Sequence, residues 1–394
     1  MFNFKRVVIL SLLVASSASA NIELITYDAQ ALQYNKSHLA EKELALNELK
    51  KKANEALKSE IDPVTNKTLL PASGNKHDYF SFGPYWWPNP DTEDGLPYVR
   101  RDGEYNRDTL TSVTDKQRFI QFANDVTDLG LAYYFTDDDR YAKKAVEQLD
   151  AWFINPETIM NPHLEYAQAI PGILDGRGIG IIDSRLLIPV IDSVYLIQEH
   201  LTKSQYESIV NWYAQFNNWL ITSDHGFDLD NYPNNLGTWY DAQVVAFSLF
   251  VGEEELAKKQ LKITQMRRIR GHFGDEGKQP GELLRTRPWH YSNFNLEAYN
   301  YLGHFGELVD VDVWNYKFDH HSLEAGYSYL ASYLAEDKPW EYKGLKGLEP
   351  NYSYKNMLYA QRAYDDPVFD KALSELQEDK LNIKKIENLT LIKY

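Results

Sequence analysis

Apolar residues with helical spacing recur along nearly the whole chain, whereas the alternation of a half-buried strand is scarce. One segment, 238–251, is apolar on almost every side, so other elements must surround it. Buried helices that alternate with exposed helices favour an all-α fold, an (α/α) toroid of about six to seven helical hairpins whose inner helices line a cleft. The predicted helices span 37–60, 115–135, 140–153, 184–200, 203–220, 238–251, 253–268, 292–308, 322–334, 354–363 and 368–378.

The first twenty residues are predicted to be a signal peptide rather than part of the fold. Lys5 and Arg6 precede the apolar run VVILSLLVA, and Ala18, Ser19 and Ala20 form a small-residue cleavage site. The run is too short to span a bilayer. We therefore expect cleavage after Ala20, a periplasmic or secreted protein, and one domain over 21–394, since no linker rich in Pro, Gly or Ser divides it.

The formal net charge of −16 argues against a nucleic-acid partner. Net charge does not describe a cleft, however, and one segment is locally basic. Between 267 and 290 the chain carries Arg267, Arg268, Arg270, Lys278, Arg285 and Arg287 against Asp275, Glu276 and Glu282. The sequence therefore allows a basic site for an anionic substrate on an acidic protein.

Three long stretches, 77–106, 161–183 and 223–237, are predicted to be irregular and to carry function. They are rich in aromatic and charged residues. The chain has 28 Tyr, 17 Phe and 9 Trp, and large aromatic faces suit both core packing and stacking on sugar rings. Ordinary packing accounts for most of them.

The familiar cofactor and metal motifs fit poorly. The glycine-rich DGRGIG at 175–180 follows a loop and lacks the spacing of a dinucleotide-binding turn. Asp224, Asp228 and Asp230 do not match a calcium-binding loop. We expect no cofactor and no metal at these positions.

Two short motifs carry groups suited to acid and base chemistry on an anion. Adjacent Asn234 and Asn235 precede a Gly and an aromatic pair, and RTRPWHY places Arg285, Arg287, His290 and Tyr291 just before a helix. A free tyrosine has a pKa of about 10 and is a poor base at neutral pH. Neighbouring cations favour the phenolate, so we expect them to lower the pKa of Tyr291. A packed surface salt-bridge cluster is the alternative interpretation.

Removal of the proton alpha to a uronate carboxylate is one reaction that needs the amide, guanidinium and phenol groups of these two motifs. The reaction builds a dianionic enolate, so amide and guanidinium groups must first offset the charge of the carboxylate. In mannuronate and glucuronate the C5 proton and the departing O4 lie on the same face of the ring. One Tyr can therefore act as base and then as acid.

The stretches SFGPYWWPNPDTEDGLPYVRRDGEYN, NPHLEYAQAIPGILDGRGIGIID, NNLGTWYD and RTRPWHYSNFNLEA together resemble the alginate lyase domain superfamily, closest to its polysaccharide lyase family 38 branch. The resemblance runs from His77 to Trp314. It implies an (α/α) toroid and β-elimination of a uronate polymer, alginate or β-glucuronan. By position it implies Tyr291 as the catalytic Tyr, Asn235 as the carboxylate-neutralising Asn and Arg285 as the active-site Arg.

The resemblance also extends to subsites, with one departure. Tyr85, Trp86, Trp87 and Trp239 would be sugar platforms, although loop packing is an equal alternative for Trp86 and Trp87. Asn234, Gln168, Arg177 and Arg287 would be substrate contacts. Leu236 occupies a position where relatives commonly carry a His, so a base on the opposite face of the ring is missing; His290 and His225 are candidate substitutes.

Two other functions remain open on the sequence. A helical-toroid glycoside hydrolase would need two carboxylates, for which Asp183, Glu282 and Glu297 are available without an evident pairing. A non-catalytic uronate-binding protein is the second, favoured by Leu236.

Overall fold

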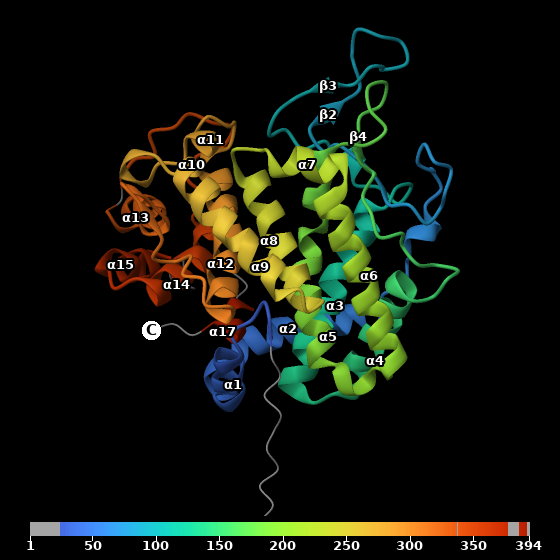
Figure 1. Ribbon diagram of the computed structural model, residues 1–394, viewed down its shortest axis with the longest axis horizontal. Helices are drawn as coiled ribbons and strands as arrows, with labels where there is room; N and C mark the ends of the chain where they lie inside the picture. The colour runs from blue at the N-terminus through green and yellow to red at the C-terminus, as the bar shows by residue number, and fades with distance from the viewer. Residues whose placement is uncertain (1–23, 337, 377–385, 392–394) are drawn as a thin grey trace, which may run out of the picture.

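The protein is described from a computed structural model, which covers residues 24–336, 338–376 and 386–391. The predicted signal peptide at 1–20 lies outside these residues. The all-α class is confirmed (Figure 1). The helices are α1 (Ala29–Ser37), α2 (Glu43–Ala56), α3 (Lys116–Thr136), α4 (Asp139–Phe153), α5 (Leu187–Leu196), α6 (Lys203–Thr222), α7 (Asp224–Asp230), α8 (Asn235–Phe250), α9 (Glu254–Ile263), α10 (Arg270–His272), α11 (Pro280–Leu283), α12 (Pro288–Leu308), α13 (Leu323–Ala335), α14 (Tyr354–Ala363), α15 (Pro367–Glu375) and α17 (Glu387–Thr390).

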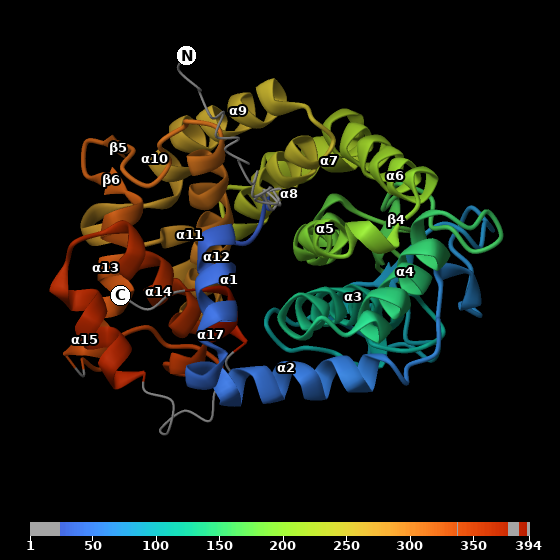
Figure 2. The same cartoon turned by 90° about the horizontal axis from the view of Figure 1, so that it is seen from below.

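The helices follow one another around a ring (Figure 2). Outer and inner helices alternate along the chain: α2 precedes α3, α4 precedes α5, α6 precedes α8, and α9 precedes α12. Neighbouring inner helices pack on one another, as α3 does on α5 and α8 does on α12. The ring is completed where α1 meets α17, because the Asn35 side chain donates to the carbonyls of Leu389 and Leu391.

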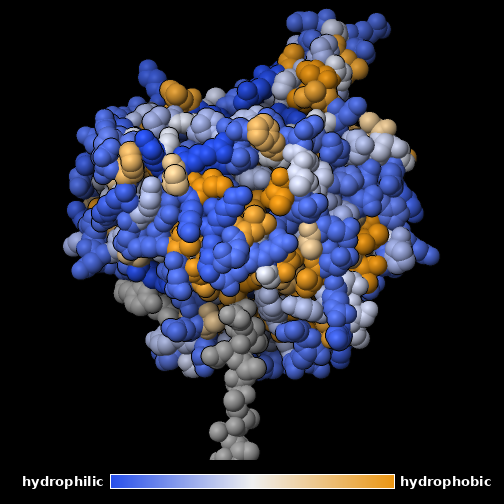
Figure 3. All heavy atoms as spheres, in the orientation of Figure 1, coloured by the Kyte–Doolittle hydropathy of each residue, from blue (hydrophilic) through white to orange (hydrophobic). Residues whose placement is uncertain are grey.

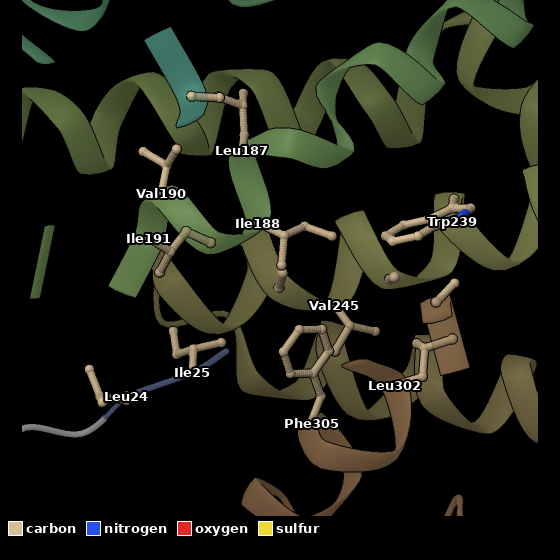
Figure 4. Packing of buried hydrophobic residues seen from close by; sticks show 14 of the residues in the cluster. Leu24, Ile25, Leu187, Ile188, Val190, Ile191, Trp239, Val245, Leu302 and Phe305 are labelled. Atoms are coloured by element: carbon tan, nitrogen blue, oxygen red, sulfur yellow. The ribbon is translucent and has the colours of Figure 1, made fainter. Parts of the chain in front are cut away.

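The inner helix α8 is buried along almost its whole length, as its apolar sequence predicted. Figure 4 shows Ile188 of α5, Val245 of α8 and Phe305 of α12 converging in the core. All three side chains are fully buried, and each contributes about 1.5–3 kcal/mol through removal from water. This packing fixes the relative positions of the inner helices and of the groups at their ends.

Helix starts differ from the prediction in two places. The region 223–237 was expected to be irregular, but it contains α7, which Ser223 caps by accepting from the N–H of Gly226. The helix predicted over 184–200 begins as a 3₁₀ segment, Gly178–Leu186, and only α5 is α-helical. Short polar caps of this kind leave little trace in apolar periodicity.

Short strands carry the loops at one end of the ring. β1 (Phe80–Phe82) pairs in parallel with β4 (Tyr166–Ala169), and β2 (Trp86–Trp87) pairs antiparallel with β3 (Val99–Arg100). The β2–β3 ribbon projects beyond the helices, and its tip extends furthest (Figure 1). A third pair joins β5 (Lys317–Phe318) to β6 (His321–Ser322).

The visible face of the molecule is largely hydrophilic, with apolar residues in scattered groups (Figure 3). None of the helices in the described part of the chain has the length and apolar character needed to cross a membrane.

Candidate active site

A cavity of about 570 Å³ opens at the end of the ring from which the β2–β3 ribbon projects. Segments far apart in the sequence line it: the ribbon, α3, β4 and the 3₁₀ segment after it, the start of α8, and the start of α12. Among the predicted site residues, the lining includes Tyr85, Trp86, Gln168, Arg177, Asn234, Asn235, Arg285, Arg287, His290 and Tyr291. Leu236 also lines it.

The cavity is basic although the protein is acidic. Its charged lining is formed by Arg100, Lys116, Arg177, Arg185, Arg285 and Arg287, with Asp183 as the acid among them. The basic segment noted in the sequence divides into two parts. Arg267 and Arg268 lie outside the lining, where they pair with Asp230, and Arg268 also pairs with Asp241. The local basic site was predicted, but four of its six cations, Arg100, Lys116, Arg177 and Arg185, come from other segments.

Two inner helices bring their N-terminal ends to the cavity. Asn234 caps α8 by accepting from the N–H of Leu236 at 3.1 Å, and Asn235 is the first residue of that helix. Tyr291 lies in the first turn of α12, which begins at Pro288. The helices lie side by side, and the indole of Trp239 in α8 donates to the carbonyl of Phe294 in α12. The helix dipole at such ends favours a bound anion, although the first N–H groups of α8 are already engaged by Glu282 and Asn234.

Asn235 is held by a buried carboxylate behind it. Its backbone N–H donates to Glu282 Oε1 at 2.5 Å, and its side-chain Nδ2 donates to Glu282 Oε2 at 2.7 Å. Burial raises the pKa of Glu282 to about 7, although these hydrogen bonds and Arg285 oppose the shift. The carboxamide is therefore tied to Glu282 at the cavity wall, with Nδ2 turned toward the carboxylate.

Tyr291 faces a second tyrosine. Its hydroxyl donates to the Tyr85 hydroxyl at 2.7 Å, and the guanidinium carbon of Arg285 lies 3.9 Å from its ring centroid. Burial raises the pKa of Tyr291, the nearby Tyr85 adds to the effect, and Arg285 opposes it. The expectation that neighbouring cations lower this pKa is therefore wrong in direction, because burial outweighs the single close cation.

Arg285 is anchored by the loop that follows β3. Its Nε and Nη2 donate to the two oxygens of Asp102 at 3.1 and 3.0 Å, and Thr286 donates to the same carboxylate. Gly103 has a φ of +74°, and a Cβ there would lie 2.2 Å from the Thr286 hydroxyl. The loop can approach this closely only because residue 103 is glycine. Asp102 thus joins the ribbon to the start of α12.

His290, and not His225, lies at the cavity. Burial lowers the pKa of His290 to about 4, and the positive charge of Arg287 adds to the shift, so the ring is neutral at pH 7. Its Nδ1 has no hydrogen-bond partner among the described residues. His225 instead contacts the carbonyl of Glu165, outside the cavity.

The opposite wall is built around Asp183. This buried carboxylate pairs with Lys116 at 3.0 Å and accepts from Tyr79, Ser81 and the Gln168 side chain. Burial opposes ionisation, but the pKa of Asp183 is lowered overall because Lys116 and the hydrogen bonds favour the carboxylate.

The same wall presents a guanidinium to the cavity. Gln168 has a φ of +49° and accepts from Arg177 at 2.8 Å. Arg177 is in this way held by the network around the buried carboxylate. The parallel β1–β4 pair, which apolar patterning did not predict, brings these groups together.

Two predicted sugar platforms are not at the cavity. Trp239 is 2% exposed and packs between Phe294 and Tyr301, so the prediction for this residue is wrong: its helix is buried on all sides. Trp87 lies outside the cavity, where Arg101 stacks 5.1 Å above its ring.

Sequence analysis missed several groups of the site. It gave no role to Lys116, Arg100, Arg185, Asp102 or Tyr232, and it considered Asp183 and Glu282 only as acids of a hydrolase. Their functions depend on partners distant in the chain. The usable signal was a charged residue at the start of a predicted helix, as with Lys116.

The family model described as alginate lyase matches residues 63–340. An alginate lyase from Bacteroides ovatus is 32% identical, covers 93% of this chain and 98% of its own, and superimposes with a TM-score of 0.88. Alginate lyase A1-III from Sphingomonas species A1 is 14% identical, covers 81% and 88%, and shares the fold with a TM-score of 0.50. A comparison with curated proteins finds no match. The helical ring and these likenesses define the protein as a polysaccharide lyase. The chain belongs to the alginate lyase family.

Proposed function

We propose that this enzyme cleaves a 1,4-linked uronate polymer, alginate rich in mannuronate, by syn β-elimination with Tyr291 as both base and acid. One observation carries the proposal: the hydroxyl of Tyr291 and the carboxamide of Asn235 reach one basic cavity from the N-terminal ends of two adjacent inner helices. The alginate lyase from Bacteroides ovatus, with which this chain shares 32% of its residues, supports alginate as the polymer.

Binding comes before chemistry. The uronate carboxylate lies against Asn235 at the start of α8, where the amide and the helix end offset its charge. The cations of the lining, Arg100, Lys116, Arg177 and Arg287 among them, attract the neighbouring uronates. A neutralised carboxylate makes the C5 proton acidic enough for removal.

The elimination then moves one proton from carbon to oxygen. Tyr291 takes the proton from C5, the electron pair of that bond forms the C4–C5 double bond, and the C4–O4 bond breaks. Tyr291 returns a proton to O4 on the same face. The products are an unsaturated uronate end and a free 4-hydroxyl group.

The raised pKa of Tyr291 suits the second half of this cycle, since a neutral phenol is a competent acid. The first half requires the phenolate, which forms when the phenol gives its proton to solvent before turnover and is restored each time Tyr291 protonates O4. Arg285 lies over the ring, and the Tyr85 hydroxyl can rotate to donate to the charged oxygen. The pair Tyr85–Tyr291 is thus suited both to the removal of the C5 proton and to the protonation of O4.

Conversion of Tyr291 to Phe tests the assignment. Formation of the unsaturated product, followed by ultraviolet absorbance with polymannuronate, should fall by about 10³-fold or more. Tyr206→Phe, in α6 and outside the cavity, is the matched control and should leave the rate unchanged. A Tyr291→Phe enzyme with the rate of the parent would refute the assignment.

Substrate preference follows from Leu236. An apolar side chain lines the cavity where relatives commonly carry a His, and the candidate substitute His290 has a pKa lowered to about 4, which makes it a weak base for the opposite face of the ring. We expect cleavage of polymannuronate or β-glucuronan to exceed cleavage of polyguluronate. A comparison of initial rates on the three polymers measures this.

A hydrolytic mechanism is disfavoured by the positions of the carboxylates. Asp183 is engaged by Lys116, Glu282 by Asn235, and Glu297 by Lys355. Among the described residues, Asp183 is the carboxylate that lines the cavity, whereas hydrolysis needs a pair. Mass analysis of the products separates the two reactions, because hydrolysis adds water and elimination does not.

We further propose that the chain is exported to the periplasm or secreted, on the basis of residues 1–20. N-terminal sequencing of the exported protein should begin at Asn21.

A further inference from the structure

Glu282 is a buried carboxylate without a cation of its own. It is 1% exposed, and no Lys, Arg or His of the described residues forms an ion pair with it. A Cβ on neighbouring Gly281 would lie 3.0 Å from the carbonyl of Pro233 and 3.3 Å from the Asn234 side chain. The helix α11 therefore packs directly on the turn that begins α8, and Glu282 has little room to move.

The charged and titratable groups around Glu282 are few. Arg285 follows it along the chain but already pairs with Asp102, and Tyr299 of α12 interacts with its charge from the other side. Asn235 of α8 supplies both hydrogen bonds and is not titratable. Burial therefore dominates, and the pKa of Glu282 rises to about 7.

The present hydrogen bonds orient the Asn235 carboxamide in a way that does not suit an anion. Because Nδ2 donates to Glu282, the carbonyl end Oδ1 is the end free to face another group. An anionic carboxylate in the cavity would meet this carbonyl oxygen and, behind it, a second carboxylate. Both are repulsive, and like charges disfavour the ionised form of each other.

We propose that Glu282 is a positioning residue that takes up a proton when a uronate carboxylate binds, and that its acid form turns the Asn235 carboxamide so that the N–H groups face the substrate. This inference rests on the proposed function, because it explains how the enzyme binds the carboxylate of its uronate substrate.

The change is small and its atoms balance. One proton passes from solvent to Glu282 Oε2, whose new O–H donates to Asn235 Oδ1, while Glu282 Oε1 still accepts from the backbone N–H of Asn235. The carboxamide rotates about its terminal torsion, which has a broad, two-fold energy profile.

Proton uptake on binding is the direct measurement. In the Tyr291→Phe background, which prevents turnover, a mannuronate oligomer is titrated calorimetrically at pH 7.5 in buffers of different ionisation enthalpy. We expect uptake of roughly half a proton or more per oligomer bound, and affinity that falls up to about tenfold per pH unit between pH 7.5 and 9.

Two substitutions at residue 282 separate proton uptake from packing. Glu282→Gln mimics the acid form, since its carbonyl accepts from the backbone and its amide donates to Oδ1; uptake should vanish and affinity should become independent of pH. Glu282→Leu leaves the backbone N–H of Asn235 without a partner and should weaken binding at every pH. The control is Asp128→Asn, because burial raises the pKa of Asp128 to about 6 away from the cavity, and it should not change the uptake.

The outcomes distinguish this inference from the function on which it rests. Binding without proton uptake, or uptake that survives Glu282→Gln, overturns the role of Glu282 and leaves the lyase assignment standing. A folded protein that binds no uronate oligomer overturns the proposed function and this inference with it.

Discussion

The two walls of the cavity each contain a buried carboxylate, and the two differ in their partners. Asp183 pairs with Lys116 and accepts three further hydrogen bonds, so its pKa is lowered. Glu282 has only the two N–H groups of Asn235, and burial raises its pKa to about 7. Similar burial thus gives a permanent charge on one wall and a titratable group on the other.

The difference between the two carboxylates matches the different roles that we propose for the two walls, substrate binding and catalysis. The Asp183 wall holds Gln168 and Arg177, which we propose as contacts for the uronate chain. The Glu282 wall holds Asn235 beside Arg285 and Tyr291, the groups that we propose carry out the elimination. Asp183, which is paired with a cation, suits binding at a constant charge. Glu282, which has no cation, suits a site where charge changes.

Loss of the compensating cation should have the largest effect on stability. Lys116→Met leaves Asp183 buried and unpaired, and we expect the free energy of unfolding to fall by about 3–5 kcal/mol. Urea denaturation measures it. The double variant with Asp183→Asn should recover much of the loss, and Lys143→Met, in an exposed pair, should cost little. Equal losses in the single and double variants would mean that packing, not charge, makes the difference.

Removal of the carboxamide should affect catalysis more than binding. Asn235→Ala takes away a donor to the charge that develops on the carboxylate, so kcat should fall by about 10²–10³-fold, a loss of about 2.7–4 kcal/mol. Asn231→Ala, an exposed amide before the same helix, is the control. A rise in KM with unchanged kcat would instead mean that Asn235 contributes to substrate binding and not to the chemical step.

Titration of Glu282 should also make the stability of the protein depend on pH. The folded-state pKa of Glu282 lies above the unfolded value, so the folded state binds more protons between about pH 4.5 and 7 and loses stability as the pH rises through that window. Relative to Glu282→Gln, the parent should be about 3 kcal/mol less stable at pH 8 than at pH 4.5. Thermal melts of both proteins across pH test this, and a constant difference between them would contradict it.

The smallest effect on catalysis is expected from a substitution on the Asp183 wall. Arg177→Met removes a cation held by Gln168 rather than a reacting group, so KM for polymannuronate should rise about tenfold while kcat changes little. Steady-state kinetics separate the two parameters. A large fall in kcat would remove the distinction between the walls.

The periodicity of apolar residues predicted the helical fold well, because long helices in a layered protein must repeat their buried face. It failed where caps and short strands decide the structure, as at α7 and the β1–β4 pair. The sequence motifs located Tyr291, Asn235, Arg285 and Arg177 at the cavity.

Their charge states were beyond sequence reasoning. Tyr291 has a raised pKa because the surrounding fold buries it, and the partner of Arg285 is Asp102, which lies on a distant loop. Trp239 shows the same limit, since an aromatic beside a motif is indistinguishable from a core residue until its neighbours are known.

The β2–β3 ribbon has one further consequence. Its base supplies Trp86 and Arg100 to the cavity, and Asp102 fastens it beside α12, whereas residues 88–98 line nothing inside. Exchange of that tip would leave the residues that line the cavity in place. The tip is therefore a segment in which selection or engineering can change the surface at this end of the ring while the cavity lining stays intact.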